Sequence, residues 1–280
     1  MVRAAALPSR EGAAALAVVA HRHARARSLW PREHGAYAQL ALPLLAAAGA
    51  GHPGPAAWLM TGAAVAGFLA HGPLLICLGQ RGPRARAEAG ALARARLIWL
   101  ASAGTVLGLA GVALATPAAW AASVVAVAAA VGLGALAAKR REKTVAGEIV
   151  AALALSGCSL PVALVSGWSP AAAVAAFVGW ATGFSAVTLA VWPLAHKRRQ
   201  GPAGRLATVL VPAAALGVGT LVFNPVAATV SVPLLLAAAL VVALQPSPRH
   251  LRRVGWGVAV AGVTAAIAVV AVALEWPRFL

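Results

Sequence analysis

Apolar and polar positions alternate along the chain in long blocks rather than with the short period of a soluble helix or strand. Apolar stretches of roughly the 20 residues that cross a membrane as an α-helix recur over the whole length. They are rich in Ala and Leu and show no two-residue alternation, which argues against the strands of a membrane β-barrel. The pattern therefore predicts an all-α, polytopic membrane helix bundle.

We predict nine transmembrane helices, several of them preceded by a loop that contains Pro or Gly. The predicted spans are residues 37–51, 55–79, 97–115, 117–138, 145–166, 170–194, 206–223, 226–244 and 254–274. Residues 1–30 form a basic tail before a single transmembrane domain over residues 31–280. The basic residues of the tail follow its short apolar stretch, so the tail does not have the order of a secretory signal.

The basic residues are placed on one side of this topology. Of the 23 Lys and Arg residues, 22 lie in the tail or in alternate loops, and the intervening loops have none. Because basic loops stay in the cytoplasm, we expect a cytoplasmic N-terminus and an outside C-terminus in the cell inner membrane. The net charge of +17 comes from basic residues in the tail and loops that border the spans, so no nucleic-acid partner is expected.

Small residues at fixed spacing indicate close helix contacts. Gly104 and Gly108, like Gly179 and Gly183, are four residues apart and share one helix face. We expect them to pack helices within one chain, and the oligomeric state is left open.

The approach to the first span is unusually polar for a membrane protein. The segment Pro31–Tyr37 includes Glu33 and His34, and Glu33 lies four residues before Tyr37 on one helix face. A helix start with a capping acid and a functional site explain this segment equally well.

Acidic residues are scarce, since the chain has six Glu and no Asp. Glu148 lies inside the start of an apolar span, where an ionised carboxylate is costly unless it is paired. It is either a helix N-terminal acid tied to Arg140 or Arg141, or a cavity-facing functional group. Glu142 lies in a basic run and is expected to be an ordinary loop charge.

His71 lies about two turns inside the second span. A lone intramembrane His is more often a helix–helix hydrogen-bonding residue than part of a site, and both readings stay open.

The segment Pro31–Tyr37, followed by Pro43, resembles the opening signature of the YwiC-like family of bacterial membrane proteins. The basic run that leads into Gly147 and Glu148 is also similar to that family. The resemblance is specific over the short opening segment and compositional elsewhere. It implies a multi-pass protein of the bacterial inner membrane and no particular activity.

The architecture also resembles the UbiA prenyltransferase superfamily, through its nine spans, inside N-terminus and possible four-helix repeat. Those enzymes use Asp-rich motifs at the cytoplasmic ends of the second and sixth spans to hold Mg²⁺ and a prenyl diphosphate. A chain without Asp cannot form these motifs. We therefore expect no metal site and no cofactor, and whether the protein is an enzyme is left open.

The sequence thus predicts a cytoplasm-facing cavity that binds a lipidic or anionic ligand, such as a prenyl phosphate, in addition to membrane lipids. Glu33, His34 and Glu148 are expected to converge there. The candidate ligand-binding residues are Glu33, His34, His71, Arg140, Arg141, Glu148, Lys197 and Arg198. A competing explanation is that the basic residues meet only bulk lipid headgroups.

Two other functions remain open from the sequence. One is a divergent, metal-independent UbiA-like prenyl or lipid transferase, although no catalytic residue is identified. The other is a small-solute or proton-coupled transporter, in which His71 and Glu148 would carry protons.

Overall fold

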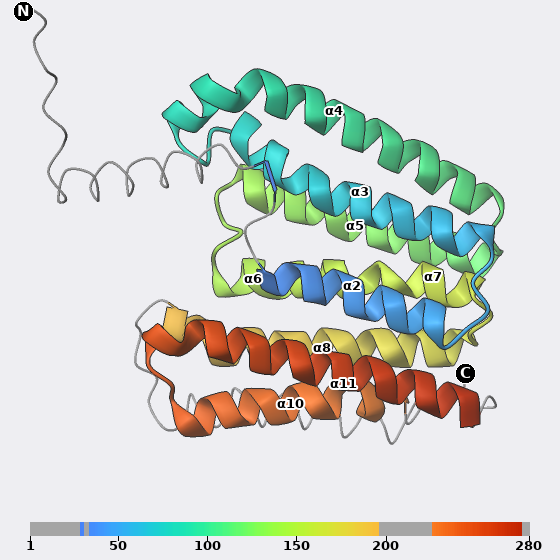
Figure 1. The fold of residues 1–280 in the computed structure, drawn as a ribbon. Coiled ribbons are helices and arrows are strands. Elements are labelled where there is room, and N and C mark those ends of the chain that lie inside the picture. The colour runs from blue at the N-terminus through green and yellow to red at the C-terminus, as the bar shows by residue number, and fades with distance from the viewer. Residues whose placement is uncertain (1–28, 31–33, 196–225, 276–280) are drawn as a thin grey trace, which may run out of the picture.

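A computed structural model describes residues 29–30, 34–195 and 226–275, and these residues are helical apart from short turns (Figure 1). The helices are α2 (His34–Gly49), α3 (Pro55–Cys77), α4 (Pro83–Ala113), α5 (Pro117–Ala138), α6 (Val145–Gly157), α7 (Ser159–Val165), α8 (Pro170–Ala195), α10 (Val226–Leu244), the 3₁₀ turn η1 (Pro248–His250) and α11 (Leu251–Glu275).

Seven segments within the described residues are long and apolar enough to cross a membrane, so the chain is a multi-pass membrane protein. One of them comprises α6 and α7, which are separated by a break at Cys158. Pro161 explains the break, because its missing N–H leaves a carbonyl one turn earlier without a helical partner. The first predicted span corresponds to the shorter helix α2, and the predicted span over 206–223 lies outside the described residues.

The helix that contains the third predicted span starts well before residue 97, because α4 begins at Pro83. Residues 83–96 are mainly Ala and Arg, which have high helix propensity, so the helix starts before the apolar run. The hydrophobic pattern marks the membrane-crossing part of this helix and not its N-terminal extension.

The basic connections of the described chain lie at one end of the bundle. In Figure 1, α3, α5 and α10 end where α4, α6 and α11 begin, so residues 78–82, 139–144 and 245–250 lie together. We call this the basic end. The turns at the other end, residues 50–54, 114–116 and 166–169, contain no Lys or Arg. The one-sided placement of charge predicted from the sequence is therefore present in the fold.

Helices α8 and α10 pack closely against each other. Trp180 and Phe184 stack with ring centroids 5.5 Å apart, and both are almost fully buried. A Cβ on Gly179 would lie 2.7 Å from the carbonyl oxygen of Ala227, and one on Gly183 would lie 2.9 Å from Cβ of Leu234. These contacts advance in the same direction along both helices, so α8 and α10 run parallel.

The second glycine pair also lies at a contact within the chain. A Cβ on Gly104 of α4 would lie 3.4 Å from Ala66 of α3, and one on Gly108 would lie 3.6 Å from Ala63. The prediction that both glycine pairs pack helices of the same chain is confirmed.

Helices α3 and α4 form a hairpin at one edge of the bundle (Figure 1). They pack closely against each other, whereas α3 reaches the rest of the chain mainly through α7. The following helix, α5, makes few contacts with α3 or α4. The hairpin therefore stands apart from α5 and α6 at the basic end, and a cavity lies between them.

Candidate functional site

The cavity at the basic end has a volume of about 580 Å³ and mixes charged with apolar walls. Its apolar lining comes from Ala36 of α2 and from Phe68 and Leu75 of α3. Its polar side chains come from α3, the turn after α3 and the loop between α5 and α6. They are His71, Gln80, Arg81, Arg140, Glu142 and Lys143.

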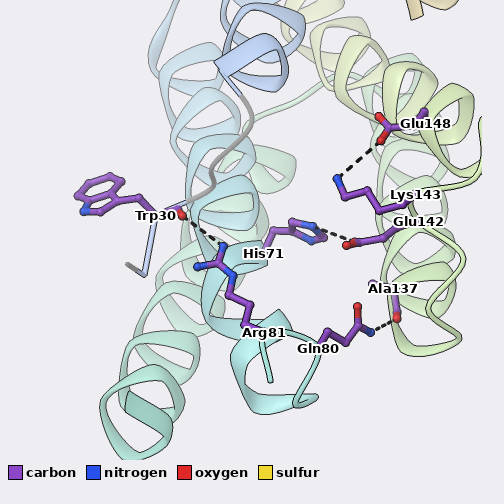
Figure 2. A network of polar contacts seen from close by, with 8 residues as sticks. All are labelled: Trp30, His71, Gln80, Arg81, Ala137, Glu142, Lys143 and Glu148. Atoms are coloured by element: carbon purple, nitrogen blue, oxygen red, sulfur yellow. Dashed lines mark hydrogen bonds and ion pairs between the residues drawn. The ribbon is translucent and has the colours of Figure 1, made fainter. Parts of the chain in front are cut away.

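Two helix ends of the same kind meet at this cavity. Two residues after the end of α3, Gly79 has φ 72°, and two residues after the end of α5, Arg140 has φ 56°. At each end, a backbone N–H from the residue after this left-handed position donates to a carbonyl five residues earlier, which closes the last turn. The Gln80 side-chain amide donates to the carbonyl of Ala137 and joins the two ends (Figure 2).

Arg140 occupies a backbone position that normally favours glycine. A left-handed conformation costs an L-residue with a side chain about 1 kcal/mol, and Gly79 avoids this cost at the equivalent position of α3. Arg140 is exposed and lines the cavity. The strain therefore falls on a residue that lines the candidate site.

The start of α6 fixes the other half of this loop. Thr144 caps the helix by accepting a hydrogen bond of 3.1 Å from the Gly147 N–H, and its hydroxyl donates to the Arg141 carbonyl at 2.7 Å. Gly147 is needed because a Cβ there would lie 2.5 Å from the Glu142 carbonyl oxygen. The loop is therefore folded tightly over α6, and this conformation directs Glu142 toward α3.

His71 and Glu142 form a pair across the cavity, with 3.2 Å between Nε2 and Oε2 (Figure 2). Only 11% of the Glu142 side chain is exposed. The hydrogen bond from His71 lowers the pKa of the Glu142 carboxyl below its ordinary value, helped by the positive charges of Lys143 and Arg81, although burial acts in the opposite direction. The carboxylate is therefore ionised at neutral pH.

The sequence-based interpretation of Glu142 as an ordinary loop charge was wrong. Its neighbours in the sequence are basic, which suggested a solvated side chain, but the folded loop turns it toward α3. The sequence feature that could have indicated a role for Glu142 was His71. A histidine inside an apolar span needs a polar partner, and the chain has few acids to provide one.

Three cations line the cavity near this pair. Lys143 Nζ lies 3.6 Å from Glu148 Oε1, and Arg81 Nη2 donates to the Trp30 carbonyl at 3.3 Å. Arg140 is the third cation. Glu148 forms an ion pair at the start of α6, as one of the two interpretations expected, but its partner is Lys143 and not the predicted Arg140 or Arg141.

The structure brings together some of the sequence-predicted residues. His71 and Arg140 line the cavity, and Glu148 contacts it through Lys143. Arg141 is exposed and is not part of the lining. His34 begins α2, but its side chain lies outside the described part, as do Glu33, Lys197 and Arg198. The predicted convergence of Glu33, His34 and Glu148 therefore stays a prediction.

Comparison with known families covers the part of the chain that contains this site. Residues 30–163 match the family model described as YwiC-like protein. Over these residues the chain is similar to YwiC-like proteins, and it is a multi-pass membrane protein. No curated protein and no solved structure matches it. All the cavity-lining residues lie inside the matched region, as do Gly147 and Glu148.

Proposed function

We propose that this protein binds an anionic amphiphile, such as a prenyl phosphate, in the cavity at the basic end without a divalent metal. The observation that carries the proposal is the combination of Arg81, Arg140 and Lys143 with an apolar wall in one cavity. Guanidinium and ammonium groups donate charge-assisted hydrogen bonds to phosphate oxygens. The hydrocarbon chain would lie against Phe68 and Leu75.

We also propose nine spans with the basic end in the cytoplasm. Helices α8 and α10 run parallel, so both cross the membrane in the same direction. The connection between them then has to return across the membrane, which supports an odd number of spans between them. The concentration of Lys and Arg at one end supports its cytoplasmic placement. A UbiA-like helix arrangement stays a prediction, and within the described residues nothing favours the transferase or transporter alternatives over binding.

Cysteine labelling tests this orientation. In a variant without Cys77 and Cys158, a membrane-impermeant maleimide added outside intact cells should label Gly54→Cys and fail to label Arg86→Cys. Gly54 lies in a turn without Lys or Arg, and Arg86 lies at the basic end. Labelling of Arg86→Cys in intact cells would contradict the cytoplasmic placement, and permeabilised cells supply the control for reactivity.

The binding proposal is tested with two substitutions in one loop. We expect Arg140→Gly to weaken farnesyl phosphate binding about tenfold or more, because a charge-assisted hydrogen bond is lost. Arg141→Ala removes the same charge outside the cavity lining and should change the affinity less than twofold. Titration of the detergent-purified protein in EDTA, with native mass spectrometry for stoichiometry, measures both.

Arg140→Gly also controls for folding. Glycine suits the left-handed backbone at this position, so the variant should unfold at the same temperature as the wild type or at a higher one. An equal loss of binding in Arg140→Gly and Arg141→Ala, falling gradually with salt, would instead indicate attraction to bulk headgroup charge and would overturn the cavity as a specific site.

A further inference from the structure

The charges around the cavity nearly balance in the absence of a ligand. Arg81, Arg140 and Lys143 supply three positive charges, and Glu142 and Glu148 supply two negative ones. Without His71, these five side chains have one net positive charge. A phosphate monoester has a charge of about −1.5 to −2 at pH 7, so its binding adds negative charge beside the His71–Glu142 pair.

His71 is suited to compensate for this added charge. Imidazole changes its charge between about pH 5 and 8, whereas Lys and Arg stay protonated over that range. Because Glu142 is ionised and only accepts hydrogen bonds, Nε2 of His71 is the donor in the pair. Nδ1 is then the nitrogen that can take up a proton while the contact with Glu142 is kept.

Titratable or charged side chains lie on several of the elements around the cavity, whereas α7, which also packs against α3, has none. The turn after α3 contributes Arg81, and the loop after α5 contributes Arg140, Glu142 and Lys143. Helix α4 contributes Arg86, whose side chain lies 3.7 Å from a Cβ built on Gly79. Helix α2 contributes Tyr37, which packs edge-on to Phe68 with 4.8 Å between ring centroids.

We propose that His71 takes up one proton from solvent when the anionic amphiphile binds, so that ligand binding and proton uptake are coupled at this site. This inference rests on the proposed function and adds its regulation. The proton goes to Nδ1, no covalent bond between heavy atoms changes, and the imidazolium then lies between the Glu142 carboxylate and the phosphate.

The direction of the pH effect follows from this coupling. The ligand binds more tightly to the protein with protonated His71, so affinity rises as pH falls. The gain is at most about tenfold per pH unit when one proton is taken up. Loss of the proton at higher pH releases the ligand, and a local acidification retains it.

Calorimetry with farnesyl phosphate tests the proposal. Binding heats measured between pH 6 and 8 in buffers of different ionisation enthalpy give the number of protons taken up. The wild type is compared with His71→Gln, whose amide N–H can still donate to Glu142 but cannot be protonated in this range. The ligand's own protonation contributes to both proteins. We expect His71→Gln to take up about one proton fewer at the pH of maximum uptake.

Glu142→Gln identifies which member of the pair receives the proton. It keeps an ionisable His71, so it should retain the proton uptake that His71→Gln loses. Uptake lost in Glu142→Gln but kept in His71→Gln would assign the proton to the carboxyl and overturn the proposal.

The same experiment separates failure of the coupling from failure of the proposed function. Equal proton uptake by the wild type and His71→Gln, with both binding farnesyl phosphate, would overturn the coupling and leave the cavity as a binding site. No binding to the wild type at any pH would overturn both. Thermal unfolding of each variant shows that the proteins compared are folded.

Discussion

Gly179→Val is expected to separate α8 from α10 and to lower the free energy of unfolding by about 1–3 kcal/mol. The added Cβ would lie 2.7 Å from the backbone oxygen of Ala227 and 2.9 Å from Cβ of Val230. Neither atom can move by a rotation about a side-chain bond, so one helix must shift. The midpoint of thermal unfolding in detergent measures the effect.

Gly134→Val is a matched control for this substitution. Gly134 lies in the apolar helix α5, and a Cβ there would have no atom within 4 Å. We expect a change within about 0.5 kcal/mol, as for surface positions without special contacts. Equal destabilisation by the two variants would show that valine itself, and not the contact between α8 and α10, causes the loss.

Gly147→Val is expected to have the largest effect on the site. The added side chain would meet the backbone of Arg141 and Glu142, which belongs to the loop between α5 and α6. Displacing that loop moves Glu142 away from His71 and Lys143 away from the cavity. Farnesyl phosphate affinity should fall more than tenfold, and overpacking should cost about 1–3 kcal/mol of stability.

Ala146→Val tests whether this effect is specific. Ala146 is exposed on the same turn of α6, so its side chain can grow outward without meeting the loop. It should keep the wild-type affinity. A folded Gly147→Val protein that also keeps the wild-type affinity would show that the position of the loop does not determine binding.

The membrane-spanning helices could largely be predicted from the sequence, because solvation by lipid requires long apolar segments whatever their tertiary contacts. Their ends were harder to predict. Helix α4 extends beyond its apolar run because Ala and Arg favour helix in water as well. The break at Cys158 depends on how Pro161 is accommodated within one span, which hydropathy does not register.

The candidate site was predicted in part. His71 and Glu148 were selected because charged or polar groups inside apolar spans need partners, and the structure gives both a partner. The identity of the His71 partner depends on a chain reversal at Arg140, where a residue other than glycine adopts a left-handed conformation. Sequence reasoning had no basis to expect that conformation, so Glu142 was assigned to solvent.

The separate packing of the α3–α4 hairpin has a consequence for biosynthesis. Its two helices are consecutive, and they contact each other far more than they contact the rest of the chain. Such local contacts form early during synthesis, so the hairpin can be complete while α5 and α6 are still being made. The wall of the cavity that α3 provides can then form before Glu142 leaves the ribosome. The contact between His71 and Glu142 marks the step at which the two halves of the site join.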